Sequence, residues 1–133
     1  MKRIINPPSL VIPSGYSHGI ESQGGRTVYL AGQVAFDSNG KLVHEGNLVG
    51  QFERALANLR ETLHAAQAEM TDIVKLLIFV KDKQDYQKHL KEIGGVYRTY
   101  FGRYFPAMSL VEVSNLFEDG ALIEIEGIAV VSE

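Results

Sequence analysis

Residues 73–81 read IVKLLIFVK, and they decide the fold because this stretch is apolar on both faces of an extended chain. Successive side chains of a strand point to opposite faces. The two apolar sets are Val74, Leu76, Ile78 and Val80 on one face, and Leu77 and Phe79 on the other. A strand of this kind is covered by protein on both sides. The stretch therefore predicts a central strand with one layer above it and another below.

A helix is predicted on each side of this strand along the chain. Asn47 is a suitable N-cap, and apolar residues recur after it every three or four positions. They are Leu48, Phe52, Leu56, Leu59, Leu63 and Ala66. The second helix is expected from about Asp85 to Tyr104, with apolar side chains along one face. Gly94 and Gly95 weaken its middle.

Further strands are predicted outside the two helices. TVYLAGQVAF (27–36) is rich in β-forming residues, and Gly32 interrupts it where a bulge or a close backbone approach is expected. The Asn-Gly pair of DSNGK (37–41) then predicts a tight reversal between strands. Pro106 cannot continue a helix, so AMSLVEV (107–113) begins a strand, and LIEIEGIAVV (122–131) forms the last one.

The order of these elements predicts an α+β fold. Crossovers between strand and helix place both helices on one face of a mixed sheet. The chain of 133 residues, 45% of them hydrophobic, is one domain's worth of sequence over residues 1–133. No third helix is available for the other face, and an apolar sheet face is most simply buried against copies of the same chain. We therefore expect an oligomer.

Composition argues against several classes of function. Thirteen Lys and Arg against sixteen Asp and Glu leave a formal charge of −3, so nucleic acid is not an expected partner. The absence of cysteine excludes disulfides, a thiol nucleophile and thiolate metal sites. No apolar run approaches the roughly 20 residues of a membrane span, and prolines break the N-terminal stretch that a signal peptide would need. We expect a soluble, cytoplasmic protein with no membrane partner.

Metal and serine chemistry have little support in the sequence. His18, His44, His64 and His89 are far apart, and none has a partner at a metal-ligand spacing, so no metal site is expected. No serine lies in a G-x-S-x-G elbow, and the glycine pairs lack the ending of a phosphate-binding loop. His18 alone keeps functional interest, because it lies beside Tyr16 in a loop bounded by glycines.

Two predicted strands near the C-terminus carry side chains that could belong to a site. Strand alternation places Glu124 and Glu126 on one face, where they either face solvent or include a cleft carboxylate that holds a water or moves a proton. Met108 shares a face of its strand with Leu110 and Glu112. Taken alone, Met108 is a core-filling side chain.

Six segments together resemble one known family. They are GYSHG (15–19), AGQV (31–34), DIVKLLIFVKD (72–82), VYRTYF (96–101), FPAMSLVEV (105–113) and IEIEGIAV (123–130). In this order they resemble the Rid family, the YjgF type of reactive-intermediate deaminase. The resemblance implies a chorismate-mutase-like α+β fold with a mixed six-stranded sheet and two helices on one face. It also implies a homotrimer with clefts between protomers, and hydrolysis of imines and enamines to oxo compounds and ammonia without metal or cofactor.

The resemblance also assigns roles to residues of the cleft. Tyr16 matches the family's cleft tyrosine, and Gly32 and Gln33 match its backbone wall. Tyr97 matches the aromatic residue of the second helix, and Glu124 matches the glutamate that positions water.

Position 108 departs from the family pattern. The deaminating branch has an arginine after FPA, whose planar fork grips the substrate carboxylate in two charge-assisted hydrogen bonds. Here Met108 stands in that place, followed by Ser109 and Leu110 in the expected binding wall. A thioether offers no charge, so the usual 2-imino acids should be poor substrates. Arg26 and Arg103 are the arginines that could reach the cleft from elsewhere in the chain and bind the carboxylate instead.

Three hypotheses follow for the function. The first is a cofactor-free hydrolase of an imine, enamine or related small C–N substrate that is uncharged or apolar where the carboxylate would lie. The alternative is a trimer that binds a small ligand or a partner without catalysis. The third, an endoribonuclease or translation inhibitor, has little support because the charge is negative and the basic residues are scattered.

Overall fold

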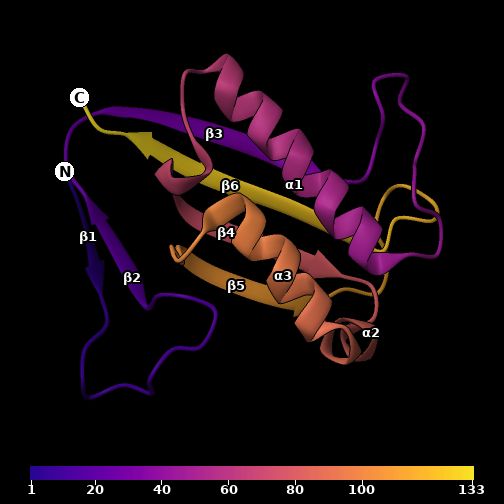
Figure 1. Ribbon diagram of the computed structural model, residues 1–133, viewed down its shortest axis with the longest axis horizontal. Coiled ribbons are helices and arrows are strands. Elements are labelled where there is room, and N and C mark those ends of the chain that lie inside the picture. The colour runs from indigo at the N-terminus through magenta and orange to yellow at the C-terminus, as the bar shows by residue number, and fades with distance from the viewer.

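The computed structural model describes residues 1–133 as an α+β fold built on a mixed sheet with helices on one face (Figure 1). Its elements are β1 (Lys2–Ile5), β2 (Gly19–Ser22), β3 (Arg26–Gln33), α1 (Leu48–Ala65), the 3-10 helix η1 (Met70–Asp72), β4 (Ile73–Val80), α2 (Lys83–Lys88), α3 (Leu90–Phe101), β5 (Ala107–Glu112) and β6 (Ile123–Val131). The main sheet has the order β3-β6-β4-β5. β6 pairs antiparallel with β3 and β4, and β4 pairs parallel with β5.

The six strands do not form one sheet, so the expected six-stranded sheet is wrong. Four strands form the main sheet, and β1 and β2 form a separate antiparallel hairpin that projects from one end of it (Figure 1). Alternation could not reveal this hairpin, because its strands have four residues each and are mostly exposed. The tight reversal predicted at the Asn-Gly pair is confirmed, because the Asp37 N–H donates to the Lys41 oxygen at 2.9 Å. The segment after it forms no strand, and only an isolated bridge joins Phe36 to Leu42.

The second predicted helix is divided into α2 and α3. The division falls at His89 and not at the glycine pair, which lies inside α3. Asp82 caps α2 by accepting hydrogen bonds from the backbone of Gln84 and Asp85. The His89 ring lies against the backbone oxygen of Asp85, with Nδ1 2.8 Å from it. The helix ends at Phe101, because Gly102 adopts a left-handed φ of 64°.

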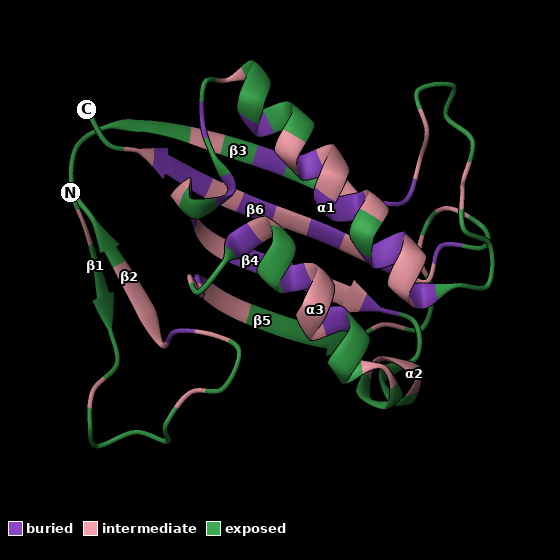
Figure 2. Cartoon of the chain, in the orientation of Figure 1, coloured by how far each residue is buried: buried purple, intermediate pink, exposed green.

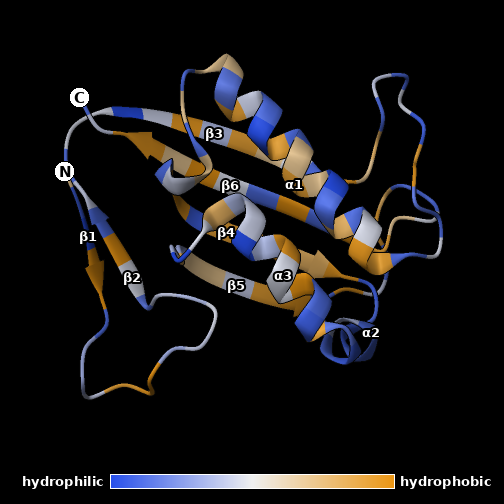
Figure 3. Ribbon diagram, in the orientation of Figure 1, coloured by the Kyte–Doolittle hydropathy of each residue, from blue (hydrophilic) through white to orange (hydrophobic).

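The core lies between the sheet and the helices. Asn47 caps α1 by accepting a hydrogen bond from the Gly50 backbone N–H at 3.0 Å. The buried side of α1 includes Phe52, Leu56 and Leu59, and Figure 2 shows buried residues spaced along the helix at the expected period. Hydrophilic residues alternate with them along α1 in Figure 3. The sheet contributes its own fully buried side chains, Leu76, Ile78, Val80, Ile123 and Ile125.

The second face of the sheet has no helix over it. α1 and α3 both lie on the side nearer the viewer in Figure 1. Alternation along β6 turns Glu124, Glu126 and Ile128 to this open face, where each is half-buried. Tyr29 lies opposite Ile128 on β3 and is 77% exposed. A partly exposed surface of mixed apolar and acidic side chains therefore remains on one side of the sheet.

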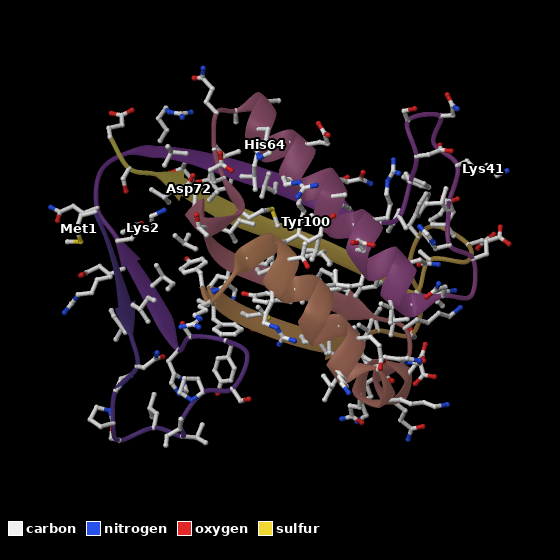
Figure 4. All side chains as sticks on the ribbon, viewed as in Figure 1. Met1, Lys2, Lys41, His64, Asp72 and Tyr100 are labelled. Atoms are coloured by element: carbon white, nitrogen blue, oxygen red, sulfur yellow. The ribbon has the colours of Figure 1, made fainter.

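The N-terminal hairpin is tied to the main sheet by Lys2. Its ammonium donates to Asp72 Oδ1 at 3.0 Å and to the Val130 backbone oxygen at 2.8 Å (Figure 4). Neither α1 nor any other helix is both long and apolar enough to span a bilayer.

Candidate functional site

The Glu124 carboxylate lies against the backbone of β3 at Gly32. The register between β3 and β6 shifts between Leu30 and Gln33, which marks a bulge on β3. A side chain at position 32 would collide with the carboxylate, so the glycine makes this close approach possible. No hydrogen bond or ion pair within the chain engages Glu124. Its oxygens are therefore free to accept hydrogen bonds from another molecule.

Ser109 lies on this open face, but Gln33 does not. Gln33 pairs with the buried Ile125, so its side chain is on the helix side, where it lines a pocket with Arg54 and Asn58 of α1. Both Gln33 and Ser109 have local partners. The Gln33 amide lies 3.4 Å from the Ala31 backbone oxygen. Ser109 Oγ accepts a hydrogen bond from Lys75 Nζ at 3.3 Å. Alternation along β5 turns Ser109 to the same side as Glu124, because both Ser109 and Glu124 lie next to β4 residues of the outer-facing set, Leu77 and Phe79.

Met108 faces the opposite side of the sheet. It lies beside Leu76 in the parallel pairing, so it points toward the helices, and Leu110 follows on that side at the sheet edge. A cavity of about 450 Å³ opens there between α3, the sheet and the loop before Tyr16. Its apolar lining includes Met108, Phe105, Ile93, Tyr97, Ile78 and Phe52. This volume is typical of a site for a small molecule.

The Tyr97 ring lines the cavity, and its hydroxyl already has a hydrogen-bond partner. The hydroxyl donates to the Tyr104 backbone oxygen at 2.7 Å. The ring stacks on Phe101 and Phe105, with centroids 4.4 and 5.2 Å away. Burial, together with the nearby Tyr104 and Tyr86, raises the pKa of Tyr97 well above its ordinary value. Tyr97 is therefore a neutral, apolar wall.

The loop before β2 closes one side of the cavity. Ser17 connects this loop to the residues just before β5 by two hydrogen bonds. The Ser17 N–H donates to the Pro106 oxygen at 3.0 Å, and the Ser17 hydroxyl donates to the Phe105 oxygen at 2.6 Å. Ser14 and Gly15 consequently line the cavity. Tyr16 is half-buried and packs edge-on against His18, with centroids 5.3 Å apart. His18 Nε2 lies 2.7 Å from the Val11 oxygen, so this histidine has a local structural partner.

The predicted site residues therefore fall into two groups within one chain. Glu124, Gly32 and Ser109 lie on the open face of the sheet, whereas Met108 and Tyr97 lie on the helix side. Two carboxylates on one strand and a methionine on another could each be assigned to a face from the sequence. Whether Met108 on β5 and the glutamates on β6 face the same side of the sheet depends on how both strands pair with β4. This pairing cannot be read from the sequence.

The arginine at the cavity is Arg98, which the sequence reasoning missed. Arg26 donates to the backbone oxygens of Ala66 and Gln67 at 3.1 and 3.4 Å, away from the cavity. Arg103 is exposed and does not line the cavity. Arg98 does line it, one helical turn after Gly94. Arg98 is exposed next to the buried face of α3, and no pattern in the sequence distinguishes it from other exposed helical arginines. The structure gathers no three His, Asp or Glu side chains that could hold a metal ion.

Comparisons with known proteins agree with this architecture. The profile of the family described as Endoribonuclease L-PSP matches residues 9–131. RutC family protein PH0854 of Pyrococcus horikoshii is 35% identical over 130 residues, which are 97% of this chain and 98% of that protein. The 2-iminobutanoate/2-iminopropanoate deaminase of Dermatophagoides farinae is 34% identical over 131 residues, 98% of this chain and 97% of the relative.

A solved structure shows the same fold. The crystal structure of YyfB from Yersinia pestis, a protein of unknown function of the conserved Rid family, superposes with a TM-score of 0.88. It is 37% identical, and the match covers 98% of each chain.

Proposed function

Because this chain belongs to the Rid (YjgF) family, we propose that it is a cofactor-free hydrolase of imines or enamines. Several relatives that match most of the chain bear the name 2-iminobutanoate/2-iminopropanoate deaminase, including those of Mus musculus and Homo sapiens, which are 37% and 35% identical. Imine deamination is thus supported at the level of the family. The observation that carries the proposal to this chain is the unpaired Glu124 carboxylate held against Gly32.

Glu124 has the chemistry that imine hydrolysis needs. In our proposal its carboxylate holds a water molecule and accepts a proton as the water oxygen attacks the imine carbon. The resulting carbinolamine loses its nitrogen as ammonia after that proton is returned, leaving the oxo compound. One water is consumed and one ammonia is released, so no oxidant or reductant is required.

The complete cleft is proposed to form between copies of the chain. Glu124 and Met108 lie on opposite sides of one sheet, so a single chain does not bring them together. The open face around Glu124 also has the apolar side chains Tyr29, Val111 and Ile128, which self-association would cover. We propose a homotrimer in which the open face of one protomer meets the cavity side of the next, with Tyr16, Gln33, Ser109 and Leu110 near the junction.

Met108 is proposed to restrict the substrate. An anion placed against the Met108 thioether would lose its hydration without gaining a partner. The cost is about 2–5 kcal/mol, or roughly 30- to 5,000-fold in affinity. Substrates with no charge at that position are therefore favoured over the smallest 2-imino acids.

The test uses 2-aminoacrylate, generated in situ from serine by a serine dehydratase. Wild type, Met108→Arg, and Met108→Arg combined with Glu124→Gln are compared by the rate of 2-aminoacrylate loss above the spontaneous rate. We expect little activity in wild type, a gain of at least tenfold in Met108→Arg, and loss of that gain in the double variant. Strong wild-type activity that Met108→Arg does not increase would contradict the role given to Met108.

A second candidate is a trimer that binds a small ligand without catalysis. The mostly apolar cavity beside Met108 favours it, because such a cavity can bind without any reacting group. Ligands that raise the melting temperature of the protein, with no turnover of the corresponding imines, would support this candidate. Nucleic-acid binding is not proposed, because the formal charge of −3 offers no general attraction to phosphates.

A further inference from the structure

The cavity beside Met108 has a single charged lining residue, the cation Arg98. All the other residues that line it are apolar, glycine, serine or tyrosine. No carboxylate of the chain forms an ion pair or a hydrogen bond with the Arg98 guanidinium. Its planar fork of N–H donors is therefore available to a ligand, in the geometry that suits a carboxylate.

Gly94 gives the guanidinium room at the cavity wall. Residues 94 and 98 lie one turn apart on the same side of α3. A Cβ at position 94 would lie 3.5 Å from Arg98 Nη1, so the guanidinium folds back over the glycine. A longer side chain at position 94 would compete with the guanidinium for this place. A glycine inside a helix lowers helix stability, and here it keeps the cation beside the cavity.

Tyr86 supplies a second donor in the same cavity. It lines the cavity from α2, and its hydroxyl makes no hydrogen bond within the chain. Burial raises the pKa of Tyr86 to about 12, so the hydroxyl keeps its proton at neutral pH. An apolar lining with these two donors matches a molecule that has an apolar body and one anionic group.

We propose that this cavity binds a monocarboxylate with an apolar chain, with the chain against Met108 and the carboxylate on Arg98 and Tyr86. The anion site is thereby moved from position 108 on β5 to α3. If the protein is the proposed hydrolase, its substrates are imines of monocarboxylic acids with an apolar chain of several carbons. This assignment of a substrate rests on the proposed function. The binding itself does not depend on turnover.

Three probes separate the two halves of the ligand. 4-Methyl-2-oxopentanoate has both a branched apolar chain and a carboxylate, 4-methylpentan-2-one has the chain alone, and pyruvate has the carboxylate with a single methyl group. Titration calorimetry on the full chain should show the first probe binding at least about tenfold more tightly than either of the others. Equal affinity for 4-methylpentan-2-one would overturn the anion site, and equal affinity for pyruvate would overturn the apolar subsite.

Arg98→Gln tests the assigned residue. Loss of a charge-assisted contact should weaken 4-methyl-2-oxopentanoate binding about tenfold or more and leave 4-methylpentan-2-one binding unchanged. Arg103→Gln is the matched control. Arg103 is exposed like Arg98 and lies five residues after it in the sequence, but it does not line the cavity. Unchanged binding of the oxo acid by Arg98→Gln would overturn the proposal. Tight binding through Arg98 with no hydrolysis of the matching imine would leave this site standing and contradict only the proposed hydrolase.

Discussion

Gly32 and Glu124 form the contact on which the proposed chemistry depends. The carboxylate occupies the space that a side chain at position 32 would need. The bulge between Leu30 and Gln33 brings the glycine backbone to this position on β3. The half-buried Glu124 carboxylate therefore lies next to the Gly32 backbone and accepts no hydrogen bond from the chain.

Substituting this glycine should therefore displace the carboxylate. Gly32→Ala is expected to lower imine hydrolysis at least tenfold while changing the melting temperature by only a few degrees, because the flexible Glu124 side chain can move away. Gly95→Ala is the matched control, since a Cβ at that helical position meets nothing within 4 Å. Full activity in Gly32→Ala would show that the position of the carboxylate does not matter.

A tyrosine of the cavity predicts how stability depends on pH. The pKa of Tyr86 is raised to about 12 by burial, so the unfolded chain loses this proton at lower pH than the folded chain. Its contribution to stability is present below about pH 10 and is lost as the pH rises through about 12. Denaturant unfolding should show that Tyr86→Phe loses less stability than wild type over this interval. Parallel pH profiles for the two proteins would contradict the effect of burial on the Tyr86 side chain.

Residue-level reasoning from the sequence reached part of the site. Alternation assigned Glu124 and Glu126 to one face and Met108 and Leu110 to one face of their own strand, and the register agrees with both assignments. It could not predict that Glu124 and Met108 lie on opposite faces of the sheet, because their strands do not pair with each other and each pairs with β4. Arg98 was missed because an exposed helical arginine has no distinguishing pattern until the cavity beside it is known.

At the scale of elements, α1 is anchored at its beginning by a buried glutamine. Gln51 is fully buried, and its amide donates to the backbone oxygens of His44 and Gly120, both at 3.2 Å. Its oxygen accepts a hydrogen bond from the Leu122 N–H at 2.8 Å. One side chain therefore joins α1 to the loop before it and to the turn that leads into β6.

Removing this amide should destabilise the fold. Gln51→Leu keeps the approximate volume but removes three part-buried hydrogen bonds to backbone groups and leaves the Gly120 oxygen and the Leu122 N–H without this partner. We expect a loss of about 2–4 kcal/mol in the free energy of unfolding. Urea denaturation would measure it, with Gln87→Leu on an exposed position of α2 as the control. A change below about 0.5 kcal/mol would mean that these groups find other partners.

Long periodic elements were predictable, and short exposed ones were not. The helix expected from Asn47 is α1, and the central strand expected at residues 73–81 is β4, each within a residue or two. β5 and β6 also agree closely with their predicted ranges. The hairpin β1–β2 depends on backbone pairing between strands of four residues, which leaves no hydrophobic period.

At the scale of the whole molecule, the sheet has one face covered by helices and one face open (Figure 2). The open face combines Glu124 with apolar side chains, so the same surface is proposed to assemble the protein and to complete its cleft. The sequence predicts self-association because no third helix is available to cover this second face of the sheet. The residues that meet across such a contact are not determined by one chain.

A charge on the open face should prevent this assembly. Val111 is 43% exposed on β5 and lies beside Phe79, so Val111→Lys places an ammonium within the apolar surface. Sedimentation velocity should show wild type at three times the chain mass and the variant at lower mass, with imine hydrolysis reduced in parallel. Thr99→Lys, on an exposed position of α3, is the control. Unchanged mass in Val111→Lys would place the interface elsewhere.

The most direct measurement is the rate of imine hydrolysis with and without the Glu124 carboxylate. An L-amino-acid oxidase acting on leucine supplies the imine of 4-methyl-2-oxopentanoate, and semicarbazide traps the portion that has not been hydrolysed. We predict that wild type and Glu126→Gln both reduce the trapped imine, whereas Glu124→Gln, with the same assembled mass, leaves it at the level without protein. Equal hydrolysis by Glu124→Gln and wild type would contradict the proposed role of this carboxylate.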